Sequence, residues 1–264
     1  MAQEKVQIEA RKRIAKRASQ EAGKILLTSF GQKLRIKSKG DRDLVTHIDQ
    51  RAETAIIKLI RRHFPQDGIL SEESPAVVSR SGFRWIIDPI DGTHNFIHQI
   101  AIFGTSIALE FNNQVVLGLI YMPVTDELYL AQKGKGAFCN GRRLSVSKRK
   151  IKEATVIYDS SLRLKKRLMF KCLDELIDKI FNVRMFGSTV RSLSYVASGK
   201  VEAEIEFNDK VWDFAAGLLL VQEAGGQATD FQGRPWSTDS KGYIASNQIV
   251  YKDIFKALKG GLQQ

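Results

Sequence analysis

The first 30 residues combine apolar and charged positions with a helical period. Apolar side chains recur every four residues, and charged side chains occupy many of the positions between them. The apolar positions are Val6, Ala10, Ile14, Ala18, Ala22 and Leu26. A stripe of this kind is typical of an amphipathic helix with one buried face. The pattern predicts one long helix from about Glu4 to Phe30, with Gly31 as its stop.

The rest of the first half contains shorter elements. A basic, glycine-containing stretch at 33–43 predicts a hairpin or loop, and a second helical pattern begins near Ile48 and ends before Pro65. Strands are predicted at 103–111, 115–121, 128–132 and 137–139. Asn112-Asn113 lies between the first two of these strands and indicates a hairpin turn.

The second half starts near residue 151 and alternates strands with helices. Strands are predicted at 154–158, 183–186, 201–207, 227–229 and 243–245. Helices are predicted at 162–180, 187–197, 211–223 and 248–258. The mixture indicates an α/β or layered α+β fold. We expect an N-terminal α+β half, residues 1–150, and a C-terminal α/β half, residues 151–264, packed as one compact unit.

Composition places the chain among ordinary globular proteins. Of 264 residues, 43% are hydrophobic and 27% are charged. The two cysteines, Cys139 and Cys172, imply no disulfide framework and fit a reducing, cytoplasmic location. The first 30 residues carry charges throughout, unlike a signal peptide, and no apolar stretch approaches the roughly 20 residues of a membrane span.

The net charge of +12 suits several partners without selecting one. Basic clusters occur at 11–17, 148–152 and 163–167, but aromatic residues are not interleaved with them as in a single-strand binder. We therefore predict that these clusters are solvated faces. A nucleic-acid or transcription partner is kept as a second hypothesis.

The stretch from Trp85 to Phe96 holds the most informative chemistry. Trp85 to Ile87 predicts a buried strand, which ends in Asp88, and Pro89 interrupts the sheet because it lacks an N–H group. Asp91-Gly92 then turns the chain. Two carboxylates three residues apart raise each other's pKa unless a cation lies between them, and Mg²⁺ favours such oxygen ligands. With N–H groups that attract phosphate at a following helical turn, the stretch indicates metal-assisted phosphate hydrolysis.

Three further acids stand at predicted element ends. Asp49 lies in the first turn of the second helix, where interaction with the helix dipole would also explain it. Glu72 follows an apolar pair at a strand end, and its neighbour Glu73 is expected in a surface loop. Asp213 lies at the start of a helix in the second half of the chain, where a simple helix-start acid is the alternative.

Four segments together resemble the inositol monophosphatase family. They are Asp43-Leu44-Val45-Thr46-x-x-Asp49, Glu72-Glu73-Ser74, Trp85-x-x-Asp88-Pro89-Ile90-Asp91-Gly92-Thr93-x-Asn95-Phe96, and Trp212-Asp213-x-Ala215-Ala216-Gly217 followed by Glu223-Ala224-Gly225-Gly226. The resemblance covers nearly the whole chain. It implies an α-β-α-β-α sandwich, a homodimer, and Mg²⁺-dependent, Li⁺-sensitive hydrolysis of inositol monophosphate or a related sugar phosphate.

The resemblance also implies the metal ligands. By position, Glu72, Asp88 and the carbonyl of Ile90 correspond to ligands of the first metal. Asp88, Asp91 and Asp213 correspond to ligands of the second. Glu72 would help to hold a third, weaker metal through water, so that two to three Mg²⁺ ions are expected per site.

Water activation and phosphate binding are implied for neighbouring residues. Asp49 and Thr93 correspond to the pair that polarises the attacking water. The N–H groups of Gly92 and Thr93 would hold phosphate oxygens. Water bound to a metal has a lowered pKa, which makes hydroxide available near neutral pH.

Substrate contacts are implied at other positions. They are Lys39, Gly187, Ser188, Thr189 and Glu206, with Lys37 as the alternative to Lys39. Thr189 departs from the usual alanine and could alter the fit of the substrate. Arg191 could favour a second phosphate, but we expect it to be a surface helix charge. His94 and His98 are expected on the substrate side or the surface.

Several alternatives stay open. A haloacid-dehalogenase-type phosphatase also uses acids before Gly-Thr, but those acids are separated by one residue, whereas Pro89-Ile90 separates Asp88 from Asp91. Fructose bisphosphatase, histidinol phosphatase or nucleotide phosphatase activity is conceivable within the same superfamily. A regulatory protein that binds RNA or the transcription machinery is the alternative of another class.

Overall fold

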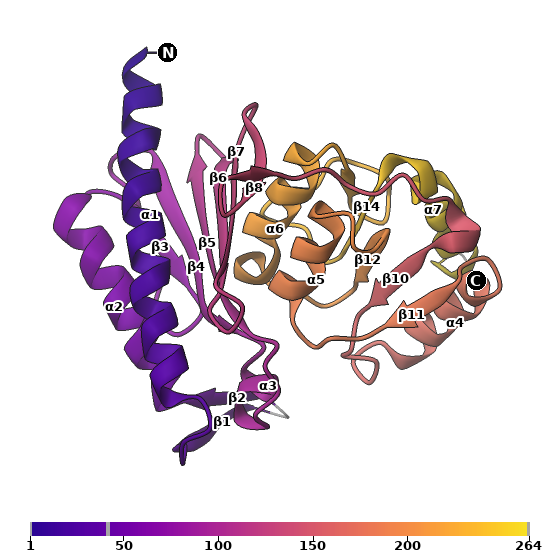
Figure 1. Cartoon of the computed structure of the whole chain (residues 1–264), viewed down its shortest axis with the longest axis horizontal. Helices are drawn as coiled ribbons and strands as arrows, with labels where there is room; N and C mark the ends of the chain where they lie inside the picture. The colour runs from indigo at the N-terminus through magenta and orange to yellow at the C-terminus, as the bar shows by residue number, and fades with distance from the viewer. Residues whose placement is uncertain (1, 41–42, 263–264) are drawn as a thin grey trace.

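The computed structural model describes residues 2–40 and 43–262. These residues form five stacked layers in the order α-β-α-β-α, as Figure 1 shows. The predicted layered α+β sandwich is therefore confirmed. The division into halves at residue 150 stays a prediction.

The first two layers are built by the N-terminal part of the chain. Helices α1 (Ala2–Ser29) and α2 (His47–His63) pack together over one face of a seven-stranded sheet (Figure 1). Its strands, in spatial order, are β3 (Gly68–Ser71), β4 (Phe83–Asp91), β5 (Gly104–Phe111), β6 (Gln114–Met122), β7 (Glu127–Gln132), β8 (Gly136–Cys139) and β9 (Arg142–Arg143). Strand β3 runs parallel to β4, and the remaining pairs are antiparallel.

The predicted hairpins are confirmed. The stretch at 33–43 contributes to an antiparallel pair of β1 (Ile36–Gly40) and β2 (Asp43–Thr46). Asn112 and Asn113 connect β5 to β6 with positive φ angles of 50° and 59°. Asparagine tolerates this left-handed conformation, which a tight hairpin turn requires at both positions.

The third layer lies between the two sheets. It consists of α5 (Thr189–Ala197) and α6 (Val211–Glu223). Helix α6 is apolar around most of its circumference, which suits a helix buried on all sides. Gly118 of β6 permits the close approach of α6, because a Cβ atom there would lie 2.5 Å from the carbonyl oxygen of Ala216.

The last two layers come from the C-terminal part. The second sheet has the spatial order β11 (Asn182–Arg184), β10 (Thr155–Tyr158), β12 (Ala203–Glu206), β14 (Tyr243–Ser246) and β13 (Gln227–Thr229). Its outer face is covered by α4 (Lys166–Ile177) and α7 (Gln248–Leu262). Two short helices complete the fold, α3 (Thr93–Ile97) and a 3₁₀ turn at Ile151–Glu153. Among the described residues, none of the helices has the length and apolarity that crossing a bilayer needs.

Two sequence predictions about helices need correction. The four-residue stripe of α1 is wrong in its first half, since Val6 is 70% exposed whereas Ile8 and Ala15 are buried. A four-residue step advances about 40° past a full turn, so such a stripe drifts around the helix. Helix α4 is shorter than predicted, because residues 162–165 form a turn in which Leu164 N–H donates to the carbonyl of Ser161.

The basic cluster at 11–17 is not wholly a solvated face. Arg11 is buried and forms a bidentate ion pair with Asp67, with N–O distances of 2.8 and 2.7 Å. Its guanidinium also lies 4.3 Å from the ring centroid of Phe64 and 3.8 Å from that of Phe83. The prediction for Arg11 is therefore wrong, because this residue ties α1 to the loop before β3 and to β4.

Candidate active site

A cleft of about 310 Å³ lies where the end of β4, the start of α5, the ends of β10 and β12, and the start of α6 converge. It is lined largely by polar side chains. Of the predicted site residues, those lining it are Glu72, Asp88, Ile90, Asp91, Gly92, Thr93, Gly187, Ser188, Thr189, Glu206 and Asp213. The two parts of the chain thus contribute to one cleft, although they are far apart in sequence.

Three carboxyl groups converge in this cleft. Oxygen atoms of Asp88, Asp91 and Asp213 all lie within 4.8 Å of one another. Asp88 and Asp91 are buried, and Asp213 is half-buried. An acidic cluster with this spacing could bind a metal, and hard divalent cations favour oxygen donors of this kind.

Burial raises the pKa of each carboxyl in this cluster. For Asp88, burial is followed in importance by repulsion from Glu72, Asp91 and Asp213, and its pKa lies well above the usual range. The pKa of Asp91 is raised to about 6, chiefly by burial. The charges are therefore unfavourable together without a cation between them.

The backbone around Pro89 places Asp88 and Asp91 together. Strand β4 does not end at Asp88 as predicted, because pairing with β5 resumes at Asp91 after a bulge. The bulge spans Pro89, which has no N–H to give to the ladder, and Ile90 N–H turns inward to donate to Oδ1 of Asp88 over 2.9 Å. The bulge brings both carboxyls to the same cleft.

Gly92 is required where the chain enters α3. Its φ of +83° lies in the left-handed region, and a Cβ atom there would lie 2.8 Å from the carbonyl oxygen of Ile102. The predicted glycine turn is therefore confirmed. The turn directs the start of α3 towards the cleft, which Gly92, Thr93 and His94 help to line.

Asp91 is held by the start of α5. The hydroxyl of Ser188 donates to its carboxyl, as do the N–H groups of Thr189 and Val190 over 3.1 and 3.3 Å. Ser188 also caps α5 by accepting from Arg191 N–H. The predicted substrate contacts Ser188 and Thr189 thus orient a candidate metal ligand, and this function was not foreseen from the sequence.

Asp49 and Thr93 meet across the cleft wall. Oγ1 of Thr93 lies 3.1 Å from Oδ1 of Asp49 and 2.9 Å from the carbonyl oxygen of Ile90. Oδ2 of Asp49 accepts from the N–H and hydroxyl of Thr46 and so completes the capping box of α2. One carboxyl oxygen of Asp49 therefore caps the helix and the other faces Thr93, whereas the part of this pair in water activation stays a prediction.

Glu53, which the sequence analysis did not single out, orders the loop that carries Glu72. Its carboxyl accepts hydrogen bonds from the hydroxyls of Ser71 and Ser74 and from the N–H of Glu73. Glu53 is buried on α2, although its helix position predicts no such role. The role of Glu53 is apparent only from its burial and its hydrogen bonds in the folded structure.

Three more acids of the cleft escaped the sequence analysis. Asp159, Glu204 and Asp209 line it together with Glu206. The alternation of acidic and apolar residues at 201–207 predicted the strand, but both faces of β12 are buried. Ala203 and Ile205 face the outer core, so the two glutamates face the cleft. The alternation could have indicated this.

The remaining predicted contacts differ in outcome. Lys39 belongs to β1, but its side chain lies outside the part of the chain that the structure describes. Lys37 is exposed and is not among the described residues that line the cleft. His94 and His98 are exposed with rings stacked 4.2 Å apart, and His94 reaches the cleft. This agrees with a place on the substrate side or the surface.

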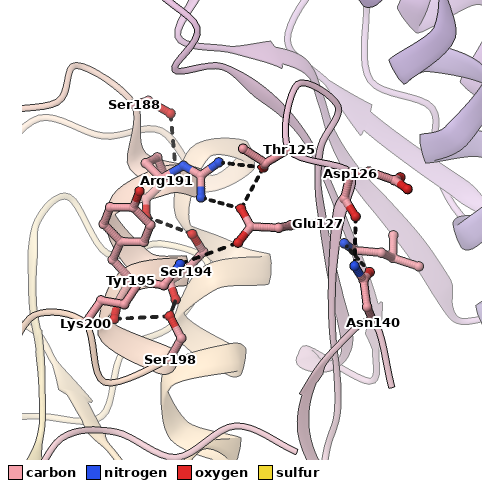
Figure 2. Close-up of polar contacts among 11 residues, drawn as sticks. Thr125, Asp126, Glu127, Asn140, Ser188, Arg191, Ser194, Tyr195, Ser198 and Lys200 are labelled. Atoms are coloured by element: carbon pink, nitrogen blue, oxygen red, sulfur yellow. Dashed lines mark hydrogen bonds and ion pairs between the residues drawn. The ribbon is translucent and has the colours of Figure 1, made fainter. Parts of the chain in front are cut away.

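Arg191 is not a surface helix charge. Figure 2 shows its guanidinium between Thr125 and Glu127, and its side chain is only 5% exposed. The Nη1–Oε2 distance to Glu127 is 2.7 Å, and Arg191 also lies over the ring of Tyr195. Hydrogen bonds from Arg191 and Thr125 lower the pKa of Glu127 to about 2, although its burial acts in the opposite direction. Arg191 therefore fixes α5 to the first sheet, which positions Ser188 beside Asp91.

The raised pKa of Asp91 predicts a pH dependence of stability. The group titrates near pH 6 in the folded protein and near pH 3.8 when unperturbed, so the folded state binds more protons between these values. Its contribution to the free energy of unfolding therefore falls as the pH rises through this window. We expect the Tm of the metal-free protein to fall from pH 4 to pH 6.5, and less so in Asp91→Asn. Thermal unfolding in EDTA measures this, and an equal slope in both proteins would contradict it.

Comparison with known proteins supports the reading of the cleft. The model of the inositol monophosphatase family matches residues 8–261. The chain is 40% identical over 248 residues to an inositol-1-monophosphatase of Mesorhizobium japonicum, covering 92% of this chain and 93% of the relative. It is 36% identical over 250 residues to a histidinol-phosphatase of Chlorobaculum parvum, covering 94% and 96%.

A solved structure agrees in fold as well. The crystal structure of the extragenic suppressor protein suhB from Bartonella henselae is 35% identical and superposes with a TM-score of 0.92, covering 95% of this chain and 98% of that one. Sequence, fold and the order of the acidic segments thus agree, and the chain belongs to the inositol monophosphatase family.

Proposed function

We propose that this phosphatase of the inositol monophosphatase family is a Mg²⁺-dependent phosphomonoesterase that acts on a small phosphorylated polyol or sugar. The observation that carries the proposal is the convergence of Asp88, Asp91 and Asp213 within 4.8 Å, beside the Thr93–Asp49 contact. A phosphate dianion could not approach these acids unless cations neutralised them.

The donor set fits Mg²⁺. All side-chain donors are carboxylates, and we assign Glu72 and the carbonyl of Ile90 to the same set because both line the cleft. Mg²⁺ keeps several waters and binds through few protein groups, which suits two to three ions here. Bound Mg²⁺ would supply charge neutralisation for the phosphate and a water activated for attack.

The protein groups orient the reactants. The Thr93 hydroxyl can donate its proton to Asp49 or to the carbonyl of Ile90, and in either case the lone pairs on its oxygen stay available to a water in the cleft. We assign this pair to orienting the attacking water, with Asp49 drawing proton density through Thr93. The N–H groups of Gly92 and Thr93, at the start of α3, are assigned to phosphate oxygens.

The proposed enzyme is a cytoplasmic homodimer that Li⁺ inhibits, as its family membership suggests. Fructose bisphosphate is the first alternative substrate. The relative named histidinol-phosphatase supports a further one.

Variants at position 93 test the proposed mechanism. We expect Thr93→Ala to lower kcat for inositol 1-phosphate about 10²–10³-fold, because the water loses its orienting group. Thr93→Ser keeps the hydroxyl and should retain activity within about tenfold of the unmodified protein. The measurement is phosphate release with Mg²⁺ on inositol 1-phosphate, fructose bisphosphate and L-histidinol phosphate. Equal activity of the alanine variant and the unmodified protein on the preferred substrate would refute the assignment.

A regulatory protein with a nucleic-acid or transcription partner is the second hypothesis. It rests on the net charge of +12. The basic cluster at 11–17 supports this hypothesis less than its sequence suggests, because Arg11 is buried in an ion pair and cannot contact a partner. Salt-sensitive RNA binding, and retention of the cellular role by an Asp88→Asn protein, would favour this hypothesis.

A further inference from the structure

Half of the acidic groups in the cleft lie outside the residues assigned to metal. The carboxyl side chains that line it are Glu72, Asp88, Asp91, Asp159, Glu204, Glu206, Asp209 and Asp213. Among the described residues that line the cleft there is no lysine or arginine. This is notable in a chain with a net charge of +12. Mg²⁺ at Asp88, Asp91 and Asp213 leaves the second group of acids, at 159, 204, 206 and 209, without a cation.

Among the described residues, Glu204 is the acid of this second group with an unpaired, buried carboxyl oxygen. The residue is 1% exposed, and it lines the cleft from β12. Ser192 lies within hydrogen-bonding reach of its carboxyl, but Oε2 has no hydrogen-bond partner among the residues the structure describes. Buried polar atoms are almost always paired, so an unpaired carboxyl oxygen on a residue that lines the cleft indicates a missing partner that a ligand could supply.

The other acids of the group differ in how many of their carboxyl oxygens accept hydrogen bonds. Asp159 accepts from the N–H groups of Ser161 and Phe207 and from the amide of Asn208, which uses both of its oxygens. Asp209 accepts from Thr189 and Tyr243, but both hydroxyls donate to the same oxygen, Oδ2. Glu206 lies within hydrogen-bonding reach of Asp159. Glu204 and Asp209 are therefore the acids best placed to bind a ligand.

Electrostatics agree with a missing positive charge. Burial, and next the repulsion from Asp209, raises the pKa of Glu204 well above its usual range. Burial also raises the pKa of Asp209, to about 8. A cation bound between the two carboxyls would offset both effects.

The geometry disfavours a metal ion as this cation. Among the described residues, the only group of three or more acids whose ligand atoms all lie within 4.8 Å of one another is Asp88, Asp91 and Asp213. The second group contains no three acids whose ligand atoms come this close together, so it does not form a compact carboxylate site for one Mg²⁺ ion. Its spread suits a larger organic cation whose N–H groups reach separate carboxyls.

We propose that the substrate is a phosphomonoester whose alcohol part carries a cationic nitrogen, an ammonium or imidazolium, which Glu204 and Asp209 bind. The inference rests on the proposed phosphomonoesterase function and names its substrate class. The phosphate lies at the Asp88–Asp91–Asp213 cluster, and the cationic part extends towards β12. Thr189 then serves the substrate indirectly, because its hydroxyl holds Asp209.

Matched substrate pairs test the proposal. Glucosamine 6-phosphate is compared with glucose 6-phosphate, and L-histidinol phosphate with inositol 1-phosphate, all with Mg²⁺. We expect kcat/KM to be at least about tenfold higher for a cationic member of the panel than for its neutral partner. Glu204→Gln should lower kcat/KM for that cationic substrate about 10–100-fold, mainly through KM, and change the neutral one by less than about threefold.

A control and a binding measurement complete the test. Glu153→Gln removes one exposed acid outside the cleft and should leave the substrate preference unchanged. L-Histidinol and glucosamine, which lack phosphate, are added in a thermal-shift titration. A rise in Tm that Glu204→Gln abolishes would support the proposal, and it does not depend on catalysis.

The outcomes separate the two proposals. Equal kcat/KM for charged and neutral esters, together with no shift from either amine, would overturn the cationic substrate and leave the phosphatase intact. A Glu204→Gln protein with an altered Mg²⁺ requirement and unaltered substrate preference would overturn it in favour of a metal site. Binding of an amine through Glu204 without hydrolysis of any ester would support the cation site and contradict the proposed function.

Discussion

Asp88→Asn is expected to abolish metal-dependent phosphate release while stabilising the metal-free fold. Asp88 is buried close to the other acids of the cluster, and its pKa is raised by burial and by Glu72, Asp91 and Asp213. A metal contributes several kcal/mol to transition-state stabilisation, so kcat should fall by about 10³-fold or more. Removing one of the repelling charges should raise the Tm in EDTA.

The measurements are phosphate release at saturating Mg²⁺ and thermal unfolding with EDTA or Mg²⁺. The Tm of the unmodified protein should rise on addition of Mg²⁺, whereas the Tm of Asp88→Asn should rise much less. Asp253→Asn, an exposed acid of α7 outside the cleft, serves as the matched control and should behave as the unmodified protein. An Asp88→Asn protein that keeps its full activity would contradict the assignment of this cluster.

Arg11→Leu is expected to cause the largest loss of stability. The side chain of its bidentate partner, Asp67, is only 1% exposed. After the substitution, the Asp67 carboxylate would still accept hydrogen bonds from Ser81 and Trp85, but it would have lost its positively charged partner. Breaking a buried pair by removing one partner costs about 3–5 kcal/mol. For a protein of this size the Tm should fall by roughly 6–20 °C.

Two variants distinguish this effect from a general effect of charge. Arg13→Leu removes an exposed positive charge two residues away on α1 and should change the Tm by little. Arg11→Leu combined with Asp67→Asn neutralises the stranded acid and should recover part of the loss. Chemical denaturation measures the free energy of unfolding. A kcat measured at denaturant concentrations well below the unfolding transition checks that catalysis is unaffected. Equal losses from Arg11→Leu and Arg13→Leu would contradict the ion-pair account.

Local signals predicted most of the fold. The hairpin at Asn112-Asn113 was foreseen because its turn chemistry is local. Helix α1 was foreseen in extent, but its buried face was wrong near Val6, since a four-residue repeat drifts from the true helical period. Arg11 was misjudged because its partner Asp67 is 56 residues away, and no local pattern reports such a pairing.

The candidate site was predictable where chemistry is concentrated in one segment. Asp88, Asp91 and Gly92 stand in one short stretch whose proline and glycine dictate its geometry. That Ser188 and Thr189 donate to Asp91 could not be foreseen, because it depends on how α5 packs against β4. The acids of the second group are scattered over the end of β10, β12 and the loop before α6: Asp159 directly follows β10, and only the folded chain brings them to one cleft.

In the proposed mechanism, cations held by Asp88, Asp91 and Asp213 drive phosphate ester hydrolysis. The most direct test is phosphate release by protein stripped of metal with EDTA, dialysed, and titrated with Mg²⁺. We predict no turnover of any ester in the panel before Mg²⁺ is added, and saturable recovery as it is restored. Turnover that is unchanged by stripping, or that stays absent for every ester despite Mg²⁺ and an intact fold, would contradict the claim.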